Sequence, residues 1–410
     1  MRNDKSAIHR RRFLGLASGA LVVPQAIVVP GAQGGFRVDA DYRGGNIVVD
    51  KIDGNSISVH QDLAHTKGWW FYWNFRVRGA AGRRLRVKFT NRDVIDLCGP
   101  AISTDGGRNW SWLGADVDGR ADWPDDGNSF TYLVPADSDE VRFCLAMPYQ
   151  EADLERFLKR HQGDSHLAVE AHCETRKGRT TRRLRLGKLD GEPRYRVAFT
   201  CRHHACEMMN SWCLEGILDE ILSESEDGRW FRRNVEVAAV PFMDKDGVEE
   251  GDQGKNRKPH DHNRDYIDEP IYPSVRALKE FLPNWSNGKL KFTLDMHCPY
   301  IKDRHIFFTM KGGGSLEENT RRFINLLEKH QRGPLRFSTK HSKVWPPSWG
   351  DQSKTNQGWC GTLPRIEVAT GMELPYAKNG NQPVTPDRAR ALGRDIVRAI
   401  RVYLEQETGE

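Results

Sequence analysis

Residues 201–212, CRHHACEMMNSW, follow the apolar segment YRVAFT and place two histidines, a cysteine and a glutamate within the five positions 203–207. His204 and Glu207 are three positions apart, so on a turn or a first helical turn their side chains lie on one side and can reach one ion. Two histidines, one glutamate and a water form a recognised catalytic zinc set, of which this pair would supply two ligands. Alone, the spacing is also typical of a solvated helix N-terminus, where the dipole favours a glutamate.

Further candidates follow in the chain. His297 ends the apolar run LKFTLDMH, and Glu367 lies in PRIEVATG. The charged segment 244–266 has the composition of a solvated loop, but it joins a predicted strand to the next helix on the side of the sheet where the histidines lie. There are two weaker alternatives. One is another metal set drawn from His203, His260 and His262. The other is a thiolate zinc site around CRHHAC, for which the sequence offers no second pair of closely spaced cysteines.

The elements that must position these residues are strands alternating with helices beyond Arg194. Strands are expected in YRVAFTC, VEVAAVPFM, LKFTLDMH, HIFFTM and PRIEVAT, and helices at 207–223, 272–283, 315–331 and 386–405. This alternation predicts an α/β fold, with a mixed, mostly parallel sheet flanked by helices. Ligands of such sheets collect beyond the carboxyl ends of the strands, which is where His204 and His297 are expected.

The first half of the chain differs. Residues 36–148 show short alternating segments separated by turn clusters, which predicts an all-β sandwich domain over 35–150. A helical pattern at 149–161 and a second β region then lead into the predicted catalytic domain, 151–408.

The N-terminus has the features of an export signal. Residues 1–34 combine a basic start with a short apolar run, and Arg10, Arg11, Phe13 and Leu14 fit the twin-arginine pattern R-R-x-F-L. We therefore expect a periplasmic or extracellular protein without stable membrane insertion after cleavage. An uncleaved membrane anchor is the alternative.

Charge argues against a nucleic-acid partner. Four of the six net positive charges fall within residues 1–34, so the remaining chain is close to neutral. The pairing of the eight cysteines stays open, because twin-arginine substrates usually fold in a reducing compartment.

Taken in order, these motifs resemble the zinc metallocarboxypeptidases of the carboxypeptidase A clan, in particular the cytosolic carboxypeptidase branch. The similarity covers nearly the whole chain after the signal, including WFYWNFRV at 70–77. The motifs that carry it are H-x-x-E at His204–Glu207, D-G-V at Asp246–Val248, an inverted G-N-x-R at Gly254–Arg257, D-x-N-R at Asp261–Arg264, LDMH ending at His297, and RIEVATG with Glu367.

The resemblance implies a site around one Zn²⁺ ion held by His204, Glu207 and His297. Glu367 would be the general base for the attacking water, and Arg257 would stabilise the oxyanion. It also implies a carboxylate clamp and an outer carboxylate.

In that clamp, Asn263 and Arg264 would hold the terminal carboxylate of a peptide or protein substrate. Asp261 would orient the first histidine ligand. The implied activity is removal of C-terminal amino acids, possibly glutamate, for which Lys354 or Arg365 are candidate pocket cations.

The chain departs from the family at two points. Arg257 and Asn263 are closer together than is common, and no tyrosine occurs between Lys340 and Glu367, where the family has one. Trp345 or Trp359 could line that place, but an indole has no phenolic proton. Two alternatives therefore stay open: a peptide-binding module with little turnover, and an amidase acting on cell-wall peptides.

Overall fold

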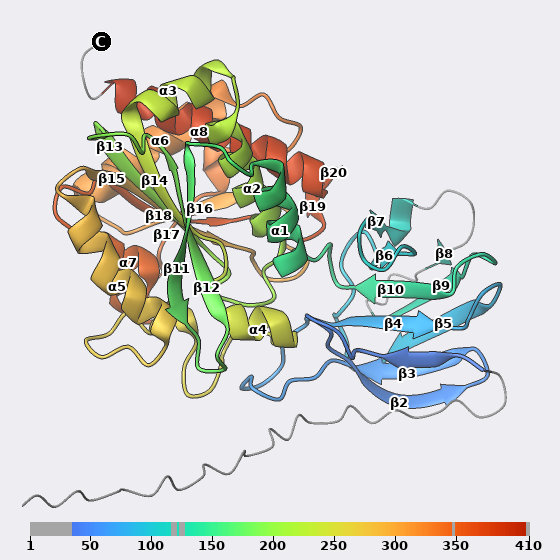
Figure 1. Ribbon diagram of the computed structural model, residues 1–410. Coiled ribbons are helices and arrows are strands. Elements are labelled where there is room, and N and C mark those ends of the chain that lie inside the picture. Colours follow the sequence, from blue (N-terminus) through green and yellow to red (C-terminus); the bar gives the residue numbers. More distant parts are fainter. Residues whose placement is uncertain (1–34, 116–120, 123–127, 347–348, 407–410) are drawn as a thin grey trace, which may run out of the picture.

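The computed structural model describes residues 35–115, 121–122, 128–346 and 349–406. The signal predicted for residues 1–34 lies outside these ranges, so export stays a prediction. Figure 1 shows a β-rich part beside a larger part in which helices cover a sheet. Among the described residues, no helix combines the length and apolar character needed to cross a membrane.

The β-rich part consists of two five-stranded sheets, in the orders β1-β4-β10-β6-β7 and β2-β3-β5-β9-β8. Strand β5 alternates exposed and buried residues at every position, as a strand with one covered face requires. Its buried side chains join a core around Trp73. The strands are β1 (Arg37–Asp39), β2 (Val48–Asp53), β3 (Ser56–His60), β4 (Asn74–Arg78), β5 (Arg84–Phe89), β6 (Ala101–Ser103), β7 (Ser111–Trp112), β8 (Ala121–Asp122), β9 (Ser129–Leu133) and β10 (Glu140–Cys144).

The larger part is built on an eight-stranded sheet in the order β11-β12-β14-β13-β15-β18-β16-β17. Its central strands β14, β13, β15 and β18 are parallel, whereas β11, β12 and β16 add antiparallel pairs. The predicted mixed sheet is thereby confirmed. Its strands are β11 (Leu167–Glu174), β12 (Thr180–Gly187), β13 (Tyr195–Cys201), β14 (Val235–Val240), β15 (Leu290–His297), β16 (Phe307–Met310), β17 (Lys343–Val344) and β18 (Val368–Glu373). A small hairpin pairs β19 (Lys378–Asn379) with β20 (Gln382–Pro383).

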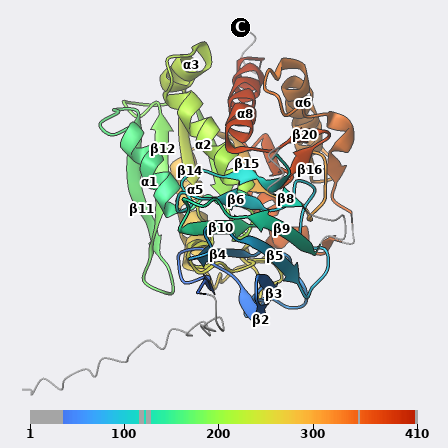
Figure 2. The same ribbon diagram turned by 90° about the vertical axis from the view of Figure 1, so that its right-hand side faces the viewer.

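Helices cover both faces of this sheet. Along β13, Val197 and Phe199 face the core shared with α2 and α8, whereas Ala198 faces a second core shared with α5 and α7. Figure 2 shows α2, α6 and α8 running beside one another in the turned view. The helices are α1 (Glu151–Arg160), α2 (Met209–Leu222), α3 (Glu226–Asn234), α4 (Lys245–Glu250), α5 (Pro273–Ser286), α6 (Ser315–His330), α7 (Asn356–Cys360) and α8 (Pro386–Gln406).

Two glycines, which lack a Cβ atom, let α2 and α8 approach closely. A Cβ on Gly216 would lie 2.2 Å from the Arg390 carbonyl oxygen, and one on Gly393 would lie 2.3 Å from the Cys213 carbonyl oxygen. This tight pair packs behind the strands that carry the candidate site. All eight cysteines are free thiols, which answers the pairing question that the sequence left open.

One loop of the larger part, residues 249–258, makes several of the contacts between the two parts of the chain. The Gly44 amide donates to the Glu249 carbonyl oxygen at 2.8 Å, and Asn46 Nδ2 donates to the Gly251 carbonyl oxygen at 2.7 Å. Thr66 pairs with Arg257 in an isolated β-bridge. The β-rich part therefore holds the loop that follows α4, within the charged segment 244–266.

Candidate metal centre and active-site pocket

Three side chains that are far apart in the sequence converge at the carboxyl ends of neighbouring strands. His204 and Glu207 follow β13 on a turn closed by the Glu207 amide, which donates to the His204 carbonyl oxygen at 3.2 Å, and His297 is the last residue of the adjacent β15. His204 Nδ1 lies 2.9 Å from Glu207 Oε1, and His297 Nδ1 lies 2.7 Å from Glu207 Oε2. The two Nδ1 atoms are 3.1 Å apart.

The chemistry of this donor set fits a metal ion. Two imidazole nitrogens and a carboxylate, all buried, face one point, with their ligand atoms within 4.8 Å of one another. Burial raises the pKa of Glu207, but the charges of His204, Lys255 and His297 hold it well below its usual range. An ionised carboxylate among converging imidazoles suits a divalent cation with nitrogen and oxygen ligands.

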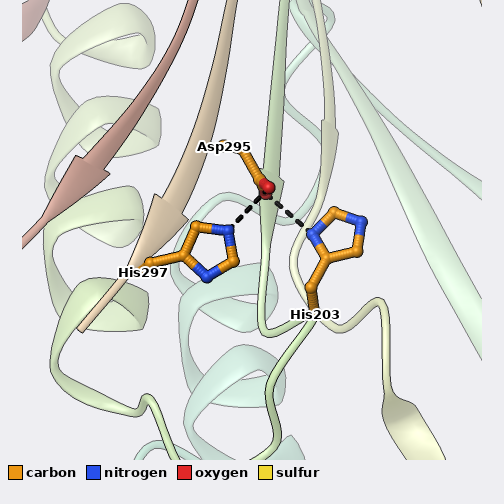
Figure 3. A group of neighbouring side chains, drawn as sticks. All are labelled: His203, Asp295 and His297. Carbon is orange, nitrogen blue, oxygen red and sulfur yellow. Dashed lines mark hydrogen bonds and ion pairs between the residues drawn. The ribbon is translucent and has the colours of Figure 1, made fainter. Parts of the chain in front are cut away.

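Asp295 fixes the orientation of one of these histidines. Figure 3 shows its carboxylate between His203 and His297, which bind Oδ1 and Oδ2 at 2.7 and 2.6 Å. Since His297 uses Nε2 for this contact, its Nδ1 remains free to face Glu207. These three residues also satisfy the spacing of a metal cluster, but each imidazole here donates to the carboxylate, which is how a carboxylate orients a histidine ligand from outside.

A pocket of about 340 Å³ opens beside the three candidate ligands, and Glu373 forms part of its wall. Glu373 is the last residue of β18 and pairs in register with His297. Its Oε2 is buried without a hydrogen-bond partner among the described residues. Burial raises the pKa of Glu373 to about 7, with Glu207 adding to the rise and His297 and Lys255 opposing it.

The structure contradicts the placement of Glu367 in this site. The sequence predicts a strand that passes through Glu367, but β18 begins one residue later and comprises the six residues Val368–Glu373. The Glu367 amide donates to the carbonyl of Lys291, next to the start of β15, at the opposite end of the sheet from His297. Its carboxylate pairs with Lys291 and accepts from Tyr403 Oη at 3.3 Å.

The structure also does not bring Arg257 to the pocket. Its guanidinium pairs with the carboxylates of Asp244 and Asp252, and it is not among the pocket-lining residues. Lys255 lines the pocket instead, with Nζ 3.3 Å from Glu207 Oε1. Of the two cationic residues of this motif, Lys255 and Arg257, it is therefore Lys255 that approaches the candidate metal ligands.

Of the remaining predicted residues, Asn263 and Arg264 line the pocket, whereas Asp261 approaches a candidate metal ligand without lining it. Asp261 Oδ2 is 3.7 Å from His204 Nε2, the ring nitrogen that faces away from Glu207. Asn263 and Arg264, in a 3₁₀ turn over His262–Arg264, both line the pocket, and Asn263 Oδ1 accepts from the Asn356 amide at 2.8 Å. Of the competing histidines, His260 binds Asp265 at 2.7 Å and His262 stacks on Tyr272 at 3.6 Å between ring centroids.

Aromatic side chains surround the pocket mouth. Trp345 lines the pocket as expected, whereas Trp359 packs on Tyr266 and does not. A tyrosine is present after all, because Tyr300 lines the pocket from the segment after β15, with 51% of its surface exposed. It packs against Phe71, which belongs to the β-rich part, at 5.6 Å between ring centroids.

Sequence reasoning thus missed Glu373, Lys255, Asp295 and Tyr300. The signal for Glu373 was available: the apolar run after Glu367 continues to Met372 and ends at a glutamate, as the run LKFTLDMH ends at His297. Asp295 precedes His297 by two positions, so both side chains point to one face of β15.

Comparisons with solved structures show the fold. The chain superposes on the metallo-carboxypeptidase of Burkholderia cenocepacia with a TM-score of 0.76 and 19% identity, covering 90% of this chain and 99% of that one. The fold is therefore that of the metallocarboxypeptidases. No family model matches the sequence.

Sequence relatives agree with this fold. Cytosolic carboxypeptidase 6 of Caenorhabditis elegans is 21% identical, over 93% of this chain and 90% of its own length. Cytosolic carboxypeptidase 2 of Xenopus tropicalis is 30% identical over 34% of this chain, but the match spans only 15% of that relative. An uncharacterised protein of Zymomonas mobilis, ZMO1242, is 22% identical, over 90% of this chain and 97% of its own length.

Proposed function

We propose that the chain is a zinc-dependent carboxypeptidase that hydrolyses the last peptide bond of peptides or proteins. The observation that carries this proposal is the buried group of His204, Glu207 and His297 beside a pocket whose wall includes Glu373. The Oε2 atom of Glu373 is buried and has no hydrogen-bond partner in the part of the chain that the structure describes. Two histidines and one glutamate are a ligand set of catalytic zinc sites. When bound, zinc would act as a Lewis acid on the scissile carbonyl and lower the pKa of a water.

Glu373 is the proposed general base, in the role that the family resemblance implies for Glu367. A carboxylate with a pKa near the working pH can both accept a proton and return it, and burial raises the pKa of Glu373 to about 7. It would take a proton from the attacking water as the new C–O bond forms. It would then give that proton to the amide nitrogen as the C–N bond breaks, leaving a shortened carboxylate and a free amino acid.

Arg264 and Asn263 are the proposed clamp for the substrate's terminal carboxylate. Arg264 lines the pocket, and among the described residues its Nε and Nη2 have no hydrogen-bond partner, so this edge of its planar guanidinium is available for two parallel hydrogen bonds. Its Nη1 donates to the Asn263 carbonyl oxygen at 2.8 Å, which ties the two clamp residues together. A clamp of this kind restricts hydrolysis to chain ends.

The identity of the released residue is a separate part of the proposal. Lys354 pairs with Asp351 at 3.3 Å and, like Arg365, does not line the pocket, so neither residue supports a preference for glutamate. The charged wall residues Asp303 and Lys343 carry opposite signs. The preference for the released residue is measured with a panel of peptides that differ only in their C-terminal residue, which is glutamate, lysine, leucine or D-alanine.

Export is proposed from residues 1–34 alone. Replacing Arg10 and Arg11 by lysine should retain the protein in the cytoplasm, as fractionation and blotting would show. Unchanged export of that variant would count against the twin-arginine route.

The test of the function uses full-length protein loaded with zinc, with metal content measured by mass spectrometry. Peptides with a free carboxyl terminus should lose single residues from that end, chelation should stop the reaction, and amidation of the terminus should protect the peptide. Equal cleavage of amidated peptides would favour the amidase. Zinc and peptide binding without any released residue would favour the binding module.

A further inference from the structure

We propose that the ammonium group of Lys255 stabilises the oxyanion that develops on the scissile carbonyl, the role that the sequence pattern gave to Arg257. The inference rests on the proposed carboxypeptidase function and deepens it by naming a further residue that touches the reacting atoms. In the structure it is Lys255, two positions before the arginine that fits the motif, that lines the pocket.

Arg257 is committed to structural contacts. Its guanidinium is held between the carboxylates of Asp244 and Asp252, and only 11% of its side chain is exposed. Asp244 Oδ1 also accepts from the Gly247 amide at 2.9 Å as the N-cap of α4. Releasing Arg257 toward the pocket would leave the buried carboxylate of Asp244 without its counter-ion, which is strongly unfavourable for a buried ion pair.

Lys255 is already at the reacting centre. Its Nζ lies 3.3 Å from Glu207 Oε1, and it shares the pocket wall with His204, His297 and Glu373. Its ammonium also lies 5.7 Å from the ring centroid of Trp70, a pocket residue contributed by the β-rich part. A cation in this position faces the space in which a carbonyl next to the three candidate metal ligands would gain negative charge.

The backbone around Lys255 is fixed from two sides. Gly254 has φ +76°, and a Cβ there would lie 2.1 Å from the Ala205 amide nitrogen, so the loop packs against the turn that carries His204 and Glu207. On the other side, Gln253 Nε2 donates to the Tyr72 carbonyl oxygen at 2.8 Å, and Gln253 Oε1 accepts from the Tyr72 amide at 2.7 Å. The β-rich part thus positions Lys255 through Gln253.

The chemistry requires no proton transfer from the lysine. When the water oxygen bonds to the carbonyl carbon, the π electrons of the C=O bond move to oxygen, and the protonated ammonium stabilises that charge by proximity and hydrogen bonding. A lysine acts as a compact point charge, whereas an arginine would present a planar fork. In the resting protein the same ammonium pairs with Glu207, so a purely structural role as a counter-ion is the alternative to exclude.

The test compares Lys255→Met and Lys255→Arg with Arg257→Met, each loaded with zinc. Loss of an oxyanion donor typically lowers kcat by about 10²–10³-fold, and we expect this for Lys255→Met with zinc content and KM little changed. Lys255→Arg should recover part of kcat. Arg257→Met should lower the thermal midpoint but keep kcat within a few-fold for the folded fraction.

Binding supplies a readout that is independent of turnover. Titration calorimetry with a peptide phosphonate, which mimics the tetrahedral oxyanion, should show a loss of affinity of about 10²-fold in Lys255→Met, against a few-fold for the cleavage product. An equal loss for both ligands, a loss of zinc in Lys255→Met, or an unchanged kcat would overturn the role of Lys255 while leaving an active wild type. A wild type that neither retains zinc nor cleaves any peptide would instead remove the proposed function and this inference with it.

Discussion

Glu373 lies directly opposite His297 in the parallel pairing of β18 with β15, each as the last residue of its strand. The sheet register therefore places a buried carboxylate beside a candidate metal ligand at the edge where α/β sheets bind their ligands. A shift of β18 by one residue would turn Glu373 to the other face of the sheet, because side chains alternate along a strand. Glu373 therefore reaches the pocket wall only in this register.

Glu367 should prove dispensable for catalysis. Its ion pair with Lys291 is partly exposed and lies at the far end of the strands, so Glu367→Gln should cost at most about 1 kcal/mol of unfolding free energy. Denaturant titration measures the stability change, and single-turnover kinetics should give wild-type rates. A large loss of rate at unchanged stability would restore Glu367 to the mechanism.

Asp295 should control metal affinity through His297. Its Oδ2 accepts from His297 Nε2 at 2.6 Å, and its Oδ1 binds both His203 and Thr200 Oγ1. Replacing such an outer carboxylate typically lowers metal affinity by about 10–100-fold, and we expect this range for Asp295→Asn. Competition with a zinc-binding dye measures the zinc affinity. The matched control is Thr200→Val, which removes a neighbouring contact but leaves the carboxylate of Asp295, and its zinc affinity should fall by much less.

Arg264 should determine the requirement for a free terminus. Hydrogen bonds to charged groups contribute about 1.5–3 kcal/mol, so Arg264→Gln should raise KM by roughly 10–100-fold for free-acid peptides. It should also narrow the difference in rate between free and amidated peptides. Lys354→Gln, which removes an exposed cation outside the pocket, should change neither quantity. Retained discrimination in Arg264→Gln would contradict the clamp.

His172 should make stability fall in mild acid. Burial lowers its pKa to about 4, although its Nε2 contacts the Ser274 carbonyl oxygen at 2.9 Å. The unfolded chain, with an ordinary histidine pKa of about 6.5, binds more protons between pH 6.5 and 4, so this contribution is fully present above pH 6.5 and is lost as the pH falls. The loss amounts to at most about 3 kcal/mol.

The check is the unfolding free energy of wild type and His172→Gln across pH 4–7. Because glutamine does not titrate, the unfolding free energy of wild type should fall relative to that of His172→Gln as the pH is lowered from 6.5 to 4. Parallel curves would show that His172 does not titrate differently in the two states.

The sequence predicted the fold and most residues of the candidate site because those features follow from local patterns. Strand and helix alternation sets the sheet, and residues after strand ends such as His204 and His297 meet at one edge. Glu373 was missed because its role depends on where β18 ends, and strand ends are set by pairing with β15 and β16 rather than by local composition. Lys255 was missed because Lys255 and Arg257 are both cations in one loop. They differ in which carboxylates surround them, which the local sequence does not show.

The central claim is tested most directly by comparing zinc-loaded Glu373→Gln with wild type and Glu367→Gln on a mixed peptide library read by mass spectrometry, with metal content measured on the same samples. We predict one zinc ion in all three proteins, release of terminal residues by wild type and Glu367→Gln, and none by Glu373→Gln. Cleavage by Glu373→Gln at the wild-type rate, or zinc retained after His204 and His297 are both replaced by alanine, would contradict the account.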